Sequence, residues 1–375
     1  MIPTKIAILP SDSPTYFHML NCMEKALQAL GITTFRLSLS NTATHKALLF
    51  EDFEKLLHFA PDLVFFIGIS GLISVSDDHL LNKYKIPYVQ FFFDYPFKLP
   101  YSSSLNHNYL KKIFTWDRLH IPIFNHFGFN DITYLPLATD PDYFEYDHKT
   151  EQTYNVSFVG TLSDENLLKN YYNQLGIRLQ ELANTELKKK AADASYKLFT
   201  CETVLPREQD CFFTDYSCYI NDRANNYKRK TYLAQLSQSH TLDIFGNSSW
   251  SSLKSIRLHS PVDYQSRLAK IFAQSKINLN LTTAQLTTAL NQRVFDCFGS
   301  GNFMLTDYQE DLDYLFPKDS VPHFTSKTEL IEKVDYYLNF PEDRIEITKI
   351  IQAEILQKHT WKHRMQEVLE ILRKS

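Results

Sequence analysis

The amino-acid sequence predicts an α/β protein built from two Rossmann-like domains, each with a parallel sheet. Short, continuously apolar segments alternate with helical stripes in the first half of the chain, most clearly at 62–69 and 86–93. Apolar runs without polar–apolar alternation are typical of parallel strands that helices cover on both faces. A similar pattern returns in the second half, and 375 residues are enough for two domains with separate cores.

In the first half we expect strands at 5–10, 33–39, 62–69 and 86–93, with helices at 15–30 and 50–59. No G-x-G-x-x-G follows the first strand, so the sequence does not predict a standard dinucleotide site. Ligands of such sheets bind at the carboxyl ends of the strands. Asp94 directly follows the strand at 86–93 and is therefore a candidate functional residue. The alternative is that Asp94 only caps the turn at Pro96.

In the second half we expect strands at 154–160, 242–246 and 276–281, after a polar linker at 145–153. The first two end at Gly160 and Gly246. A tight turn at Gly160 and Thr161 can present N–H groups to a phosphate. Asn278, on the third strand, either ties down neighbouring loops or meets a ligand. A helix is expected at 264–274, and 166–238 is mostly helical by pattern, with a role that the sequence does not predict.

The stretch 291–316 predicts a short buried helix, a glycine-rich turn, a strand and a second helix. Arg293 and Asp296 lie three positions apart near the start of the first helix, which places them on neighbouring parts of one face. A guanidinium can pair with a diphosphate, and a carboxylate can accept hydrogen bonds from ribose hydroxyls. The alternative is an ordinary surface ion pair.

The same stretch resembles the CgeB-type (spore-maturation protein-like) family of GT-B glycosyltransferases, a bacterial family. The matching residues are Arg293, Phe295, Gly301, Phe303, Leu305, Thr306, Asp307, Asp311, Leu312 and Phe316. Further matches are D-x-P at 94–96, Y-L-P-x-x-x-D-P at 134–141 and V-S-F-V-G at 156–160. Asp296 stands where that family usually has glutamate. Related enzymes carry another acid eight positions earlier, where this chain has Thr288.

The resemblance implies the GT-B fold, with two Rossmann-like domains that face each other across a cleft and a C-terminal helix that crosses back to the first domain. The expected domains are 1–150 on the acceptor side, 151–355 for the nucleotide-sugar, and 356–375 as the returning helix. It implies a hexosyltransferase-type enzyme that moves a sugar from a nucleoside-diphosphate-sugar to a hydroxyl of a protein or glycan. The expected donor is a UDP-sugar, and neither a metal nor another cofactor is expected.

We expect Asp94 to act as the base that deprotonates the acceptor. The candidate donor-binding residues are Gly160, Thr161, Gly246, Tyr264, Asn278, Asn291, Arg293 and Asp296. A catalytically degenerate protein that binds a nucleotide-sugar or a glycan remains the alternative, because Asp296 and Thr288 depart from the related patterns. A periplasmic-type binding protein is a third hypothesis, against which the lack of a signal peptide argues.

The net charge and the cysteines limit which other classes of protein the sequence is compatible with. A net charge of −4 disfavours a nucleic-acid binder. The basic clusters 188–190 and 228–230 are expected on solvated helix faces; the alternative is contact with an anionic membrane surface or an acidic acceptor. Five cysteines without a C-x-x-C pair indicate reduced thiols in the cytoplasm. No apolar run approaches the roughly 20 residues that span a bilayer, so at most peripheral membrane contact is expected.

Overall fold

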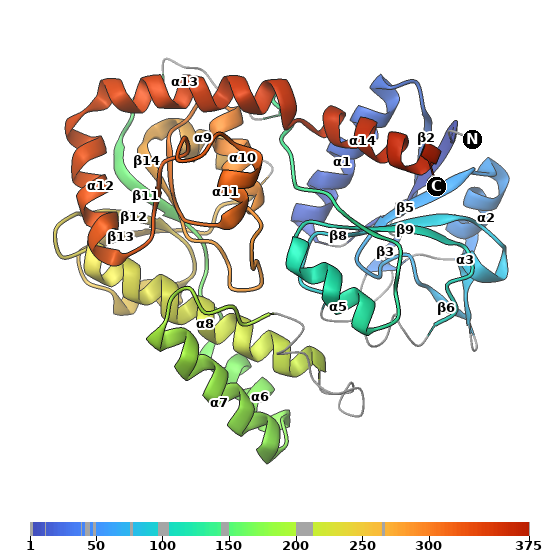
Figure 1. Cartoon of the computed structure of the whole chain (residues 1–375), viewed down its shortest axis with the longest axis horizontal. Coiled ribbons are helices and arrows are strands. Elements are labelled where there is room, and N and C mark those ends of the chain that lie inside the picture. The colour runs from blue at the N-terminus through green and yellow to red at the C-terminus, as the bar shows by residue number, and fades with distance from the viewer. Residues whose placement is uncertain are drawn as a thin grey trace. The chain divides into compact units, whose positions relative to one another are not determined.

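The chain forms two compact units: unit 1 comprises 1–137 and 360–375, and unit 2 comprises 138–359 (Figure 1). The sequence placed boundaries after residues 150 and 355. The computed structural model describes residues 3–11, 13–38, 40–41, 46–47, 50–75, 78–96, 105–143, 150–199, 213–264 and 267–374. Most of the expected linker, Phe97, Cys201 and Cys211 lie outside these ranges. The described Cys22, Cys218 and Cys297 are thiols.

Unit 1 holds a parallel six-stranded sheet in the order β10-β9-β8-β5-β1-β2. The strands are β1 (Lys5–Ile8), β2 (Thr33–Arg36), β5 (Leu63–Ile67), β8 (Tyr88–Phe92), β9 (Leu110–Thr115) and β10 (Ile132–Tyr134). Every residue of β5 and β8 is buried, which confirms that these apolar runs form central strands. Gln90, at the middle of β8, is buried beside Phe66 and donates a hydrogen bond to the carbonyl of Gly68.

Helices α1 and α2 of unit 1 begin close to the predicted starts, whereas α3, η1 and α5 were not predicted. The helices are α1 (Pro14–Ala29), α2 (Phe50–Phe59), α3 (Leu80–Lys83), the 3₁₀ turn η1 (Arg118–His120), α5 (Ile121–His126) and α14 (Trp361–Lys374). Two short antiparallel pairs complete the unit, β3 (Ser40–Asn41) with β4 (Lys46–Ala47), and β6 (Ser74–Val75) with β7 (Asp78–His79). Ser13 caps α1 through its side chain, and Gly31 follows the helix with a φ of +82°.

The C-terminal helix α14 belongs to unit 1 and packs on α1 (Figure 1). Trp361, Met365 and Val368 are fully buried along one face of this amphipathic helix. The Trp361 ring meets Phe93 edge-on, and the guanidinium of Arg364 donates to the carbonyl of Pro136 at 2.9 Å. Helix α14 therefore completes the core of the N-terminal unit although it is the last element in the sequence.

Unit 2 holds a second parallel sheet, in the order β13-β12-β11-β14-β15-β16. The strands are β11 (Tyr154–Val159), β12 (Leu242–Phe245), β13 (Ile256–His259), β14 (Ser275–Asn280), β15 (Met304–Asp307) and β16 (His323–Phe324). The edge strands β13 and β16 were not predicted. Strand β13 has no fully buried residue, and β16 has only two residues, so neither shows an apolar run.

Helices cover this sheet, and three of them, α6, α7 and α8, form a group beside it (green to yellow in Figure 1). The helices are α6 (Glu165–Gln174), α7 (Ile177–Ala192), α8 (Phe213–Leu236), η4 (Ser248–Ser252), α9 (Leu268–Gln274), α10 (Gln292–Gly299), α11 (Glu310–Leu315), α12 (Lys327–Asn339) and α13 (Pro341–Lys358). Helix α9 begins at Leu268 rather than at the expected Tyr264, which lies in a turn.

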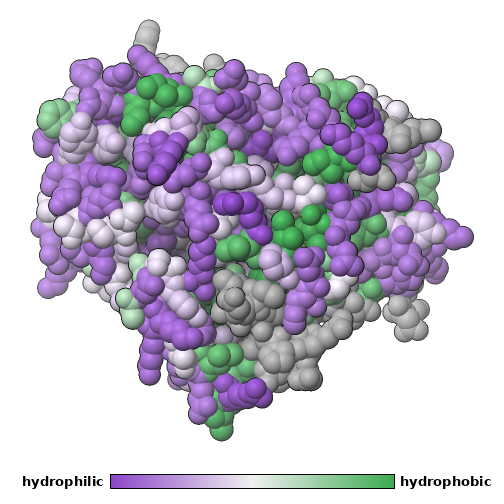
Figure 2. All heavy atoms as spheres, viewed as in Figure 1, coloured by the Kyte–Doolittle hydropathy of each residue, from purple (hydrophilic) through white to green (hydrophobic). Residues whose placement is uncertain are grey.

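The surface in Figure 2 is mostly hydrophilic, with hydrophobic side chains scattered between polar ones. Such scattered exposure is normal for globular proteins. Within the described ranges, no helix combines the length and the apolar character that crossing a bilayer requires.

We predict that Met365→Ala lowers the free energy of unfolding by about 2–5 kcal/mol, because it leaves a cavity at a fully buried position of α14. Lys362→Ala, on the exposed side of the same helix, is the matched control and should change stability by less than about 0.5 kcal/mol. Urea unfolding of both variants measures the difference. Equal stability of the two would show that α14 is dispensable for the core of unit 1.

Candidate functional site

Two glycines bring the carboxyl ends of β11 and β12 into close contact. A Cβ atom at Gly246 would lie 2.4 Å from the carbonyl oxygen of Gly160 and 2.7 Å from the Trp250 ring, so only glycine fits. The N–H of Gly160 donates to Phe245 O at 3.0 Å, and the N–H of Gly246 donates to His259 O at 3.2 Å. The N–H of Gly160 is thus used inside the sheet, and the contact of the Gly160–Thr161 turn with a phosphate stays a prediction.

Arg229, on α8, lies against this end of β11. Its Nη1 donates to the carbonyl of Thr161 at 2.6 Å, and its guanidinium carbon lies 6.0 Å from the centre of the Phe158 ring. Burial, together with the positive charge of Arg293, lowers the pKa of Arg229 to about 10. Thr161 itself is exposed.

Arg293 lies in the first turn of α10 and is half-buried. Its Nη1 is buried without a hydrogen-bond partner, and among the described residues Arg293 forms no ion pair. The surface pair with Asp296 is thus not formed. Burial lowers the pKa of Arg293, against the opposing influence of Tyr264 and Asp296. A buried guanidinium nitrogen without a partner in the protein can donate a hydrogen bond to a ligand.

The two residues before Arg293 also carry unmatched polar atoms. Asn291 Oδ1 and Gln292 Oε1 are buried and accept no hydrogen bond in the described structure. The amide of Asn291 donates to Asn280 Oδ1 at 2.8 Å, which holds its side chain against the end of β14. Three consecutive residues with unmatched buried atoms are unusual, because buried polar groups nearly always have partners. The start of α10 is therefore suited to a polar ligand.

Asp296 is fully buried, and both its oxygens accept hydrogen bonds from within unit 2. Oδ1 accepts from the Thr139 hydroxyl at 2.8 Å and from Gln292 Nε2 at 2.9 Å, and Oδ2 accepts from the Tyr264 hydroxyl. Burial raises the pKa of Asp296 to about 7, although all three hydrogen bonds favour the carboxylate. A ribose could reach Asp296 only after Tyr264 moved aside, so the predicted ribose contact is absent from this arrangement.

The side chain of Asn278 is buried and hydrogen-bonded within unit 2. Its Nδ2 donates to the carbonyls of Phe272 at 3.1 Å and Phe303 at 3.0 Å, and its Oδ1 accepts from the Ser157 hydroxyl at 3.3 Å. These bonds join β14 to its neighbours. They are the bonds that the alternative of a structural amide requires, and a contact of Asn278 with the donor stays a prediction.

Asp94 lies in unit 1, directly after β8, and is half-buried. Its Oδ2 accepts from the Tyr16 hydroxyl at 3.0 Å, and its Oδ1 accepts from the N–H of Tyr95 at 3.0 Å. Burial, together with the charge of Asp94, raises the pKa of Tyr16 well above its ordinary value, so the phenol remains a donor. The contact with Tyr95 is the kind that the turn-capping alternative requires. The role of Asp94 as a base stays a prediction.

The basic cluster 228–230 was expected on a solvated face, and this was wrong for two of its members. Lys228 pairs with Asp307, Arg229 reaches Thr161, and only Lys230 pairs with an exposed acid, Glu165. Sequence reasoning missed Arg229. The signal that could have found it is its spacing, since Leu233 and Leu236, four and seven positions later, are fully buried on the same face of α8.

The D-x-D at 140–142 lies in a turn, in which the N–H of Asp142 donates to Asp140 Oδ1 at 3.2 Å. In the part of the chain that the structure describes, no three His, Cys, Asp or Glu side chains are placed to hold a metal ion.

Sequence comparison matches residues 228–370 to the Glycosyl transferase-like family. This segment starts on α8 and includes both Arg229 and Arg293. No curated protein matches the chain.

Solved structures of similar fold cover nearly the whole chain. Sucrose-phosphate synthase from Thermosynechococcus elongatus has a TM-score of 0.57 at 8% identity, covering 99% of this chain and 98% of that one. The T4 phage β-glucosyltransferase, in complex with its UDP-glucose substrate, has a TM-score of 0.53 at 13% identity, with 99% and 98% covered. HepE from Anabaena, in complex with UDP-glucose, has a TM-score of 0.55 at 10% identity, with 99% and 100% covered. The chain therefore has the GT-B fold.

We predict that Asp296→Asn stabilises unit 2 at pH 8. The pKa of Asp296 is about 7 in the folded protein and about 3.9 in the unfolded chain. The free energy of unfolding therefore falls as the pH rises between these two values, and the full loss is present above pH 7. The amide keeps an acceptor for Thr139 and Gln292 and can donate to the Tyr264 oxygen. Urea unfolding should show a gain of about 2–4 kcal/mol at pH 8 that shrinks towards pH 5. A loss of stability at pH 8 would contradict this account.

Proposed function

We propose that this chain is a glycosyltransferase that binds a nucleoside-diphosphate-sugar in unit 2, with Arg229 and Arg293 holding the diphosphate. One observation carries the proposal: Arg293 has a buried nitrogen without a partner, and its positive charge acts on a second guanidinium, Arg229, which lies at the carboxyl end of β11. Like charges in a buried place destabilise the unliganded protein. A diphosphate offers two adjacent anionic groups with the oxygen geometry that guanidiniums bind best.

The comparisons support the class of donor. The matched family is described as glycosyl transferase-like, and the similar structures of the phage enzyme and of HepE hold UDP-glucose. We therefore propose a UDP-sugar as the donor, within the CgeB-type branch that the residues 291–316 resemble. The proposed donor contacts also include Thr161, Asn291 and, once Tyr264 has moved, the carboxylate of Asp296 on the ribose.

The proposed chemistry needs positive charge where the leaving diphosphate gains negative charge. Arg229 and Arg293 supply two such charges from a partly buried place, where electrostatic stabilisation is stronger than in water. This is the support for a reaction without a metal. Asp94, oriented by the Tyr16 hydroxyl, is the proposed base for the hydroxyl of a protein or glycan acceptor. A cytoplasmic site of action remains part of the proposal.

A binding protein without transfer activity is the second candidate. The observation that favours it is Thr288, which is buried where related enzymes carry an additional acid. Such a protein would bind the donor through the same two arginines and release no nucleotide. Release of UDP from UDP-glucose by the purified chain distinguishes the two candidates.

We predict that Arg229→Ala and Arg293→Ala each weaken UDP-glucose binding about 10- to 100-fold, because each removes charge-assisted hydrogen bonds to phosphate. The thermal shift that UDP-glucose gives the wild type should nearly disappear in both variants. Arg223→Ala removes a guanidinium of α8 that pairs with the exposed Glu165, and it should keep the full shift.

In the same experiment, Asp94→Asn should keep the thermal shift and lower sugar transfer about 100-fold or more, as removal of a general base does. Variants at Arg229 and Arg293 that bind the donor as the wild type does would show that the diphosphate binds elsewhere. Wild-type transfer by Asp94→Asn would remove Asp94 from the mechanism while leaving the donor site intact.

A further inference from the structure

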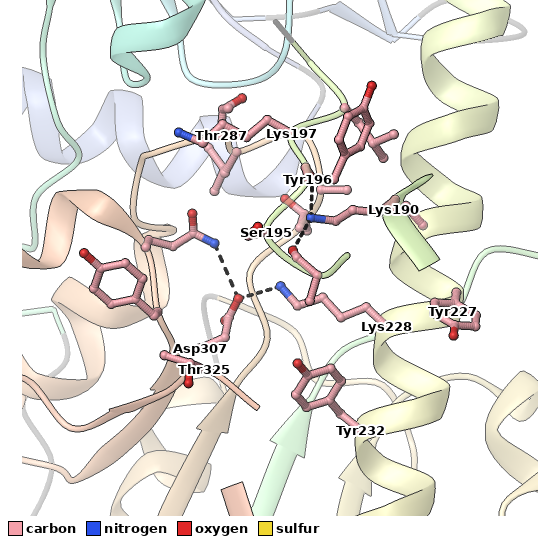
Figure 3. Close-up of a pocket in the computed structure, with 18 of the residues that line it drawn as sticks. Lys190, Ser195, Tyr196, Lys197, Tyr227, Lys228, Tyr232, Thr287, Asp307 and Thr325 are labelled. Atoms are coloured by element: carbon pink, nitrogen blue, oxygen red, sulfur yellow. Dashed lines mark hydrogen bonds and ion pairs between the residues drawn. The ribbon is translucent and has the colours of Figure 1, made fainter. Parts of the chain in front are cut away.

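Unit 2 contains a cavity of about 360 Å³ that none of the donor residues lines (Figure 3). It lies between the end of α7 with the segment 193–198, helix α8, and the segments that follow β14 and β15. Its volume falls in the range of about 300–1,000 Å³ that is usual for small-molecule sites. Lys228 lines it, whereas the next residue, Arg229, reaches Thr161. Helix α8 thus contributes Lys228 to this cavity and Arg229 to the carboxyl end of β11.

The charged side chains of the cavity do not balance. They are Lys190, Lys197, Lys228, Lys327, Asp307 and Glu310. Lys228 lies 2.5 Å from Asp307, and Lys197 pairs with Glu310. The ammonium of Lys327 lies 5.9 Å from the centre of the Tyr232 ring. Four cations against two carboxylates leave an excess of two positive charges, and within the described chain neither Lys190 nor Lys327 forms an ion pair.

Lys190 is held in place by hydrogen bonds but has no ion-pair partner among the described residues. Its ammonium donates to two carbonyl oxygens, of Ala194 at 2.6 Å and of Tyr196 at 2.7 Å. An ammonium has three donors, so one is left for a ligand. Burial, together with the charges of Lys228 and Lys197 and against those of Asp307 and Asp193, lowers the pKa of Lys190 to about 8. An anion beside this ammonium would relieve the unfavourable charge.

Aromatic side chains supply the rest of the wall. They are Tyr196, Tyr227, Tyr232, Tyr308 and Phe324. Tyr227 is 50% exposed and Tyr308 is 37% exposed, so their rings remain accessible. A site with aromatic walls and a few fixed polar groups is typical of small organic ligands, since the walls bind the body of the ligand and the polar groups orient it.

We propose that this cavity binds a small acidic carbohydrate, with its carboxylate or phosphate on Lys190 and its ring against the tyrosines. The carbohydrate nature of the ligand rests on the proposed function, whereas the anionic group follows from the lysines alone. The expectation that the cluster 188–190 lies on a solvated face is wrong for Lys190. Its neighbour Lys188 is exposed, as expected.

The test is isothermal titration of the full chain with glucuronate, glucose 6-phosphate and glucose. We expect at least one of the two acids to bind about tenfold or more tightly than glucose, as a hydrogen bond to a charged group requires. The acid that binds more tightly shows whether the anionic group is a carboxylate or a phosphate. Lys190→Gln should lose this preference. Lys188→Gln, on the same helix but exposed, should keep it, and so should Arg293→Ala, which leaves the cavity unchanged.

Two further measurements separate this proposal from a folding defect and from the donor site. The thermal shift with UDP-glucose should be the same for Lys190→Gln and the wild type. Binding of the acid should weaken between pH 7 and pH 9, as Lys190 loses its proton, and Lys190→Arg should remove that dependence. Equal binding of glucose and both acids, or unchanged binding by Lys190→Gln, would overturn the proposal, whatever the result for the donor.

Discussion

The buried carboxylate of Asp296 is the interaction on which the functional end of unit 2 depends. It accepts hydrogen bonds from Thr139, where the chain enters the unit, from Tyr264 before α9, and from Gln292 within its own helix. These segments are far apart in the sequence. One carboxylate therefore fixes the position of α10 and, with it, the guanidinium of Arg293. Burial of the carboxylate in this arrangement raises its pKa, which lowers the stability of the folded protein where Asp296 is ionised.

In the proposed donor site, the two arginines would bind the diphosphate at the expense of the stability of the unliganded protein. Arg229 and Arg293 come from helices more than fifty residues apart in the chain, and each lowers its pKa on burial. A folded protein gains nothing from two such charges unless a ligand neutralises them. Residues with strongly perturbed pKa values cluster at functional sites for this reason. The same reasoning applies to Lys190, which is buried with carbonyls and no carboxylate.

Much of the fold could be predicted from the sequence because the central strands β5 and β8 are buried on both faces and read as apolar runs, and because apolar residues alternate along β14. The edge strand β13 could not, since it carries exposed residues such as Arg257 and gives no such signal, and β16 has only two residues. For the site, the sequence predicted the position of Arg293 at the start of a helix. It missed Arg229, whose burial depends on the packing of α8. It left the role of Asn278 open, because two of the partners of this side chain are backbone carbonyls that no side-chain pattern shows.

A crystal structure of the chain with UDP bound tests the central claim most directly. The account predicts that nitrogen atoms of both Arg229 and Arg293 lie within about 3.5 Å of the diphosphate oxygens, including the nitrogen of Arg293 that has no partner in the protein. A diphosphate bound elsewhere in unit 2, with both guanidiniums unchanged, would contradict it.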